Sequence, residues 1–135
     1  MDPFTLTLTD EAGRSVHAWV TPVGDDIVIA IGGGERPHVG SLVLAQPRPS
    51  RSRPGEYTPS ISVLTIPPHK EEPMARGVAE AVSRRTGRVV TVTAGVHDDA
   101  IDLAGIRGYL RLVERLAEEL AERIPPLESG GSEPG

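Results

Sequence analysis

The apolar residues of this chain follow the two-residue period of a β-strand up to residue 66, and the period of a helix only after residue 72. Alternation of apolar and polar side chains predicts half-buried strands, and the unbroken apolar run 27–31 predicts a central strand. Glycine- and proline-rich stretches separate these runs and predict turns. The predicted strands span residues 4–9, 16–21, 27–31, 39–45, 61–66 and 89–93.

Two segments have the signals of helices. Pro73 suits the first turn of the first helix, and Gly87 suits the position just past its end. Asp102 is a good N-cap for the second helix, which Pro125 stops. An apolar stripe runs along this second helix at helical spacing. It favours a core-facing helix over the alternative, a helix in a dimer seam.

The element order is therefore β-β-β-β-β-α-β-α, which predicts an α+β fold. We expect a single twisted, mainly antiparallel sheet of about six strands with two helices on one face. The short connections favour an antiparallel meander for the first five strands. Residues 1–126 should form one domain, and the Gly-, Ser- and Glu-rich tail 127–135 should be disordered.

Composition narrows the function classes. A net charge of −5 and few aromatic residues argue against a nucleic-acid binder. The absence of cysteine excludes disulfides and thiolate metal sites and favours a reducing cytoplasm. No signal peptide or membrane-length apolar run is visible. Lys70 is the only lysine among the basic residues, an arginine bias typical of a GC-rich bacterial genome.

Polar residues follow three strands that should end at the same edge of the sheet. In a meander the third and fifth strands run in the same direction, and a helical crossover makes the sixth parallel to the fifth. The segments that follow these strands, called exits below, are residues 32–38, 67–70 and 95–99. They carry three of the four histidines and the lysine. Both helices should also begin there. Such an edge is where sheets with crossover helices bind ligands.

Arg36, Lys70, the glycine triplet 32–34 and the helix starts favour an anion such as phosphate at this rim. The triplet matches no nucleotide-binding motif, and a tight turn explains it equally well. His38, His69 and His97 with an aspartate are an alternative metal site. The pair 98–99 is an alternative acid–base pair, although helix-start acids explain it better. A small His/Asp- or metal-dependent hydrolase or lyase is thus the second functional hypothesis.

The arginines of the proline-rich loop 46–60 should lie at the opposite edge. They could contact phosphate or an acidic partner, or be a solvated loop. A homodimer is a further option, because an open sheet leaves an exposed edge.

Three segments at the predicted rim resemble the prenylated-flavin chaperone family, the D-subunit type of gallate and related UbiD-type decarboxylases. They read GGERPHVG at 33–40, SVLTIPPHKE at 62–71 and VTAGVHDD at 92–99. Pro37, His38, Gly40, His69, Lys70, Gly95 and His97 match its motif positions, whereas Pro68 stands where the family pattern has glycine.

The resemblance implies a non-catalytic accessory protein. It would bind prenylated FMN or FMN as cargo and assist its delivery to, or maturation in, a UbiD-type decarboxylase, with a flavin prenyltransferase as another partner. We assign no catalytic or metal residue. Combining the rim and the resemblance, the candidate cofactor-binding residues are Gly33, Gly34, Arg36, Pro37, His38, Gly40, His69, Lys70, Gly95, His97 and Asp98.

Overall fold

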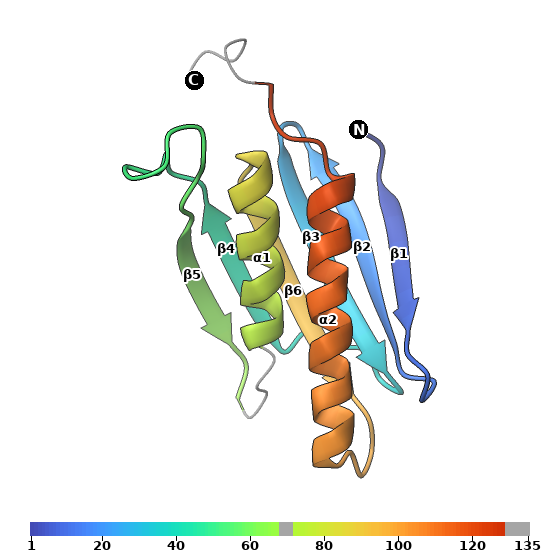
Figure 1. Cartoon of the computed structure of the whole chain (residues 1–135). Helices are drawn as coiled ribbons and strands as arrows, with labels where there is room; N and C mark the ends of the chain where they lie inside the picture. Colours follow the sequence, from blue (N-terminus) through green and yellow to red (C-terminus); the bar gives the residue numbers. More distant parts are fainter. Residues whose placement is uncertain (68–71, 129–135) are drawn as a thin grey trace.

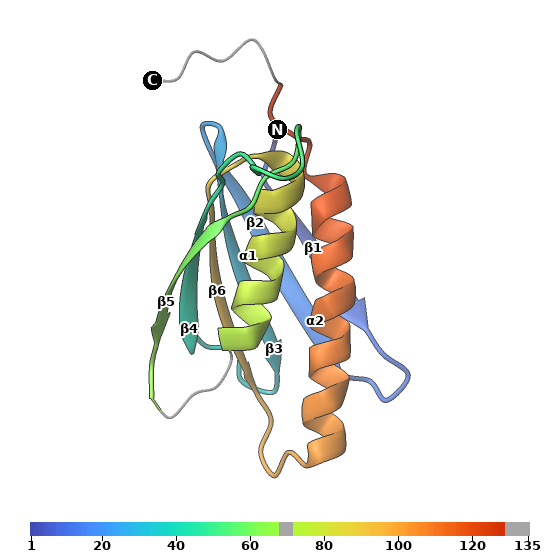
Figure 2. The same cartoon turned by 60° about the vertical axis from the view of Figure 1, so that its left-hand side comes forward.

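A computed structural model describes residues 1–67 and 72–128 of the chain. Six strands form one open sheet, and two helices lie together on one of its faces (Figures 1 and 2). The predicted α+β class is confirmed. The elements are β1 (Phe4–Thr9), β2 (Ser15–Val23), β3 (Asp26–Gly34), β4 (Ser41–Gln46), β5 (Ser60–Thr65), α1 (Glu72–Thr86), β6 (Val90–His97) and α2 (Leu103–Arg123).

The core fills the layer between the sheet and the helices. Side chains from alternate strand positions meet those of α1 and α2, which explains the two-residue period of the strands. The apolar stripe of α2 faces this core, as expected. Neither α1 nor α2 is long and apolar enough to cross a membrane. The largest fully buried side chains are Ile27, Ile29, Leu112, Leu116, Leu120, Ile124, Val16, Val20, Val43, Val78, Val82 and Val90.

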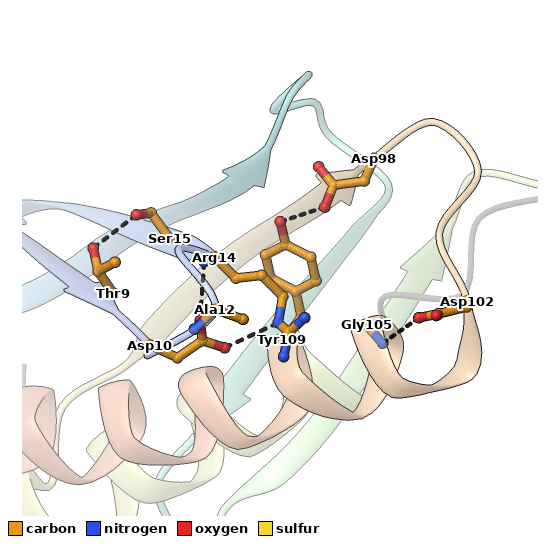
Figure 3. Close-up of polar contacts among 9 residues, drawn as sticks. All are labelled: Thr9, Asp10, Ala12, Arg14, Ser15, Asp98, Asp102, Gly105 and Tyr109. Atoms are coloured by element: carbon orange, nitrogen blue, oxygen red, sulfur yellow. Dashed lines mark hydrogen bonds and ion pairs between the residues drawn. The ribbon is translucent and has the colours of Figure 1, made fainter.

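Both helices begin and end at the predicted signals. Gly87 has φ +70° and its N–H donates to the Ser83 carbonyl at 2.9 Å, so it ends α1 as a left-handed C′ residue. Asp102 caps α2, because its Oδ1 accepts the Gly105 N–H at 2.8 Å (Figure 3). These local signals are readable because each involves residues within one turn of the helix.

The predicted meander is wrong at one step. The strand order is β1-β2-β3-β6-β4-β5, so β6 lies between β3 and β4. The β3–β6 pair is parallel and the other four pairs are antiparallel. The mainly antiparallel sheet is thus confirmed, but β3 and β4 are not neighbours. The reason is that residues 35–40 step over the end of β6, where the Gly40 N–H donates to the Ala94 carbonyl at 2.9 Å.

The directions of the strands survive this correction. β3, β5 and β6 still run the same way, because each antiparallel pairing reverses direction once. Their carboxyl ends share one rim with the starts of both helices (Figure 1). The Arg/Pro-rich loop 46–60 lies at the opposite end, where a Pro49–Tyr57 bridge closes it. Tyr57 also packs against Gly87 there, so it lies far from the rim.

Candidate functional site

Parallel pairing of β3 and β6 brings the loops that follow them side by side. Gly34 lies opposite His97 in the register. Beyond the strands, the Arg36 N–H donates to the His97 carbonyl at 3.0 Å, and the Glu35 N–H donates to Asp98 Oδ1 at 2.7 Å. One backbone–backbone and one backbone–side-chain hydrogen bond therefore hold the two loops together, at the rim that the sequence predicted.

A charged cluster lies where these loops meet. Arg36 Nη2 is 3.1 Å from His97 Nε2 and forms an ion pair with Asp99. His97 Nε2 is also 3.1 Å from Asp99 Oδ1. The hydrogen bond with His97, followed by that with Arg36, holds the pKa of Asp99 below its usual range. The side chains of Arg36 and Asp99 are 66% and 63% exposed, so the cluster is open to a ligand in solution.

His38 joins the cluster from the segment that steps over β6. Its ring centroid is 6.4 Å from that of His97, in an edge-to-face arrangement. Its Nδ1 is 3.2 Å from the Arg36 carbonyl oxygen. This crossing requires glycine below it, because a Cβ on Gly95 would stand 1.8 Å from the His38 carbonyl oxygen. The structure thus brings two histidines and an arginine together from segments about sixty positions apart.

Asp98 has a different role from the neighbouring acid. One carboxylate oxygen accepts the Glu35 N–H, and the other accepts the Tyr109 hydroxyl at 2.6 Å (Figure 3). Burial, and then this bond to Asp98, raise the pKa of Tyr109. Asp98 therefore connects the two rim loops to α2, and both of its oxygens are occupied by the protein.

A small apolar pocket adjoins the cluster. Its volume is 210 Å³, and the walls come from α1, α2 and the end of β6. Small-molecule sites usually measure about 300–1,000 Å³, so this pocket can take only part of a cofactor-sized ligand. Its lining is apolar apart from His97, Asp98 and the Tyr109 hydroxyl.

The sequence of this chain matches a family model described as the prenylated flavin chaperone LpdD-like domain, over residues 10–125. The chain belongs to this family. It has a non-enzymatic, accessory role, because the family is one of chaperones.

Among the known proteins that are similar to it are a curated relative and a solved structure. Protein LpdD of Lactiplantibacillus plantarum is 25% identical over 118 residues, which cover 83% of this chain and 79% of that protein. A chain in the crystal structure of a chaperone complex for yeast 20S proteasome assembly has a TM-score of 0.53 and 19% identity, with 90% of this chain and 97% of that chain covered. The second likeness concerns the fold alone.

The remaining candidate residues do not all lie at the cluster. A Cβ added to Gly33 would lie on the helix-covered face of the sheet beside Val16, away from the cluster. Gly34 has φ +76°, as the tight-turn explanation of the triplet expects. The triplet as a whole continues β3 instead of ending it, since Gly32–Gly34 pair with Gly95–His97. His69 and Lys70 lie outside the described residues, as does Pro68.

Pro37 and Gly40 shape the segment that carries His38. Pro37 lies over Gly32, beside the ring of Trp19, and Gly40 is buried against β6. Within residues 1–67 and 72–128, no group of three or more His, Cys, Asp or Glu side chains could hold a metal ion. The metal-site alternative included His69, which lies outside these residues, so it stays untested.

The candidate cofactor-binding residues included Asp98 but not Asp99, which entered only the alternative metal site and acid–base pair. It is Asp99 that contacts Arg36 and His97. Tyr109 was also missed as the partner of Asp98. The helical spacing of Tyr109 predicts only burial. The hydrogen bond of its hydroxyl depends on how α2 lies against the loop after β6. Local sequence patterns do not predict such a contact between distant elements.

Proposed function

We propose that this protein binds prenylated FMN, or FMN, at the rim where residues 35–40 meet residues 97–99. It carries this cargo to a UbiD-type decarboxylase and is itself no catalyst. The observation that supports this proposal is the cluster of Arg36, His38 and His97, held at one rim by the segment that steps over β6. The description of the family as prenylated flavin chaperones supports a flavin as the cargo.

The phosphate of the flavin fits Arg36. A guanidinium has five N–H donors in a planar fork, and phosphate accepts two of them side by side. In the described part of the chain, the side-chain contacts of Arg36 use one nitrogen, Nη2. The phosphate must compete with the Asp99 carboxylate for this arginine. Such competition weakens binding and favours release to a partner.

The ring system fits the adjoining pocket only in part. Apolar walls from Met74, Val96, Ile101 and Ile106 suit the edge of an isoalloxazine or its prenyl-derived ring, but 210 Å³ leaves most of the flavin uncovered. A partly covered cargo is accessible to the next protein. We include His69 and Lys70 in this site from their motif positions. A flavin prenyltransferase is the proposed donor and a UbiD-type decarboxylase the acceptor, both in the cytoplasm.

A binding titration tests the site. Arg36→Ala should weaken FMN or prenylated FMN binding by about 10-fold or more, since a hydrogen bond to a charged group contributes about 1.5–3 kcal/mol. Arg48→Ala is the matched control, because Arg48 lies in the loop between β4 and β5 at the opposite end. Equal affinities for the two variants in fluorescence titrations would show that the phosphate does not bind at this rim.

Co-expression tests delivery. A UbiD-type decarboxylase produced with a flavin prenyltransferase should gain cofactor occupancy and activity when this chain is present. His38→Ala and His97→Ala should reduce that gain, and Arg48→Ala should not. Unchanged occupancy would refute delivery. Turnover of a substrate by the purified chain alone would favour the hydrolase or lyase hypothesis instead.

A further inference from the structure

The start of α2 extends past the ends of the strands, together with the loop that precedes it (Figures 1 and 2). Three large apolar side chains are exposed on this projection, which we call the α2 tip. Ile101, Leu103 and Ile106 are 38%, 60% and 43% exposed. Neighbouring apolar side chains that stay exposed mark surfaces where a protein binds another molecule.

Capping of the helix explains only part of the α2 tip. Asp102 is the N-cap, so Ile101 and Ile106 occupy the two positions of a hydrophobic staple. Ile101 also packs over Gly105, where a Cβ would stand 2.9 Å from its Cγ1. Leu103 is outside the staple and is the most exposed of the three. The first turn of a helix favours acidic residues, and α2 has none there, so its own stability does not explain Leu103.

Leu103 begins a stripe that continues at intervals of four residues with Arg107, Arg111 and Arg115. The three arginines are exposed, and none forms an ion pair within the described part of the chain. Like charges four residues apart on a helix repel each other and destabilise it slightly. Unpaired arginines beside an apolar patch suit the carboxylates of another protein, which they can bind through two N–H donors each.

We infer that the α2 tip and this arginine stripe are the docking surface for the acceptor decarboxylase, an inference that rests on the proposed function. The surface adjoins the proposed cargo site, because Ile101 and Ile106 also line the 210 Å³ pocket. A partner seated on Leu103 would therefore lie next to the cargo. The matching surface of that partner is an apolar depression edged by aspartate or glutamate.

Two other occupants fit the surface less well. An anionic membrane would meet the exposed Glu114 and Glu118 on the same helix and a chain of net charge −5. A second copy would cover Ile101 and Ile106 and so close the pocket that the cargo must leave. Delivery requires release after each transfer, and transient complexes use small interfaces, below about 1,200 Å² in total. A projecting tip of a few side chains suits such an interface.

Binding of the cargo-free chain to the decarboxylase, measured by biolayer interferometry, tests the α2 tip. Leu103→Glu should weaken binding on the order of 30-fold, because it places a charge in the apolar centre of the interface. The variant should stay folded, since an acid in the first turn of a helix is favourable. Val23→Glu is the matched control and should bind like wild type. Val23 is 59% exposed at the end of β2, at the opposite end of the sheet.

Charge reversal tests the arginine stripe. Arg107→Glu and Arg111→Glu should each weaken docking on the order of 10-fold at low salt, and about 300 mM salt should weaken wild type more than either variant. Arg84→Glu is the matched control, because Arg84 is exposed in the last turn of α1, away from the rim. It should dock like wild type at both salt concentrations.

FMN titration of the same variants separates docking from cargo binding. Leu103 does not line the pocket, so Leu103→Glu should bind FMN like wild type. Docking of a wild type that binds no FMN would keep the docking surface and refute the proposed cargo site instead. A decarboxylase that binds Leu103→Glu as tightly as wild type, or binds neither, would overturn the inference.

Two further results would assign the α2 tip to another occupant and overturn the inference. One is a wild-type oligomer in sedimentation that Leu103→Glu dissociates, which would indicate a second copy. The other is wild type that binds phosphatidylglycerol vesicles while Leu103→Glu does not, which would indicate a membrane. Equal sedimentation of the two proteins and no vesicle binding by either are expected.

Discussion

Asp99 contacts Arg36 and His97, and its titration reports on the cluster. Hydrogen bonds from His97 and Arg36 lower its pKa below the ordinary 3.8. The contacts therefore stabilise the folded state above that value, and this contribution is lost as pH falls through the folded pKa. At neutral pH Asp99 is charged and holds Arg36.

We expect NMR titration of the Asp99 carboxyl carbon to give a midpoint below 3.8 in the wild type. In Arg36→Ala the midpoint should rise, because one of the hydrogen-bond donors is gone. Asp99→Asn should strengthen FMN binding, since the phosphate no longer competes with a carboxylate. A midpoint at or above 3.8 would mean that the cluster does not form in solution.

Tyr109 is 3% exposed and connects α2 to the rim through Asp98. Tyr109→Phe removes this hydrogen bond and leaves the ring in place. The change should lower the free energy of unfolding by about 1.5 kcal/mol, the low end for bonds to charged groups, because water can reach the half-buried Asp98 carboxylate. Urea denaturation measures it. No loss of stability would mean that the bond is worth no more than the water contacts that replace it.

Among the structural elements, the segment 35–40 decides where the site is. It steps over β6 only because Gly95 has no side chain. Gly95→Ala should force the His38 backbone away, since the new Cβ would stand 1.8 Å from its carbonyl oxygen. We expect both a loss of stability, about 2–4 kcal/mol as for other severe packing defects, and weaker FMN binding.

Gly77→Ala is the control for this element. Gly77 lies within α1, and a Cβ there meets nothing within 4 Å. The substitution should stabilise the protein by about 0.5–1 kcal/mol through helix propensity and leave FMN binding unchanged. A Gly95→Ala variant as stable as wild type would contradict the close crossing of segment 35–40 over β6.

Across the whole molecule, Arg88 joins three distant segments at the end away from the rim. It is 9% exposed, its Nε donates to the Pro125 carbonyl at 2.9 Å, and its Nη1 donates to the Asp25 carbonyl at 2.7 Å. Leu127 lies close by, with its N–H donating to the Thr86 carbonyl. The sequence predicts that the tail 127–135 is disordered. Only its residues 127 and 128 are described by the structure, and residues 129–135 lie outside it.

Arg88→Ala should therefore cost about 2–4 kcal/mol, because two carbonyls lose charged donors in a buried place. Arg88→Lys should recover part of that loss, as an ammonium reaches at most one of the two. Arg84→Ala, at an exposed position in the last turn of α1, should change stability by less than about 0.5 kcal/mol. Thermal unfolding compares them, and equal effects of Arg88→Ala and Arg84→Ala would contradict the role of Arg88.

The sequence by itself determined the elements, the caps at Asp102 and Gly87, and the shared rim of three strand exits. Each follows from local periodicity or from the count of chain reversals, which the order of strands across the sheet does not alter. Only the tertiary structure decided that β6 lies between β3 and β4 and that Asp99 contacts Arg36. Alternation says which face of a strand is buried, but it does not say which strand lies beside it. That choice depends on contacts between distant segments, such as His38 over Gly95.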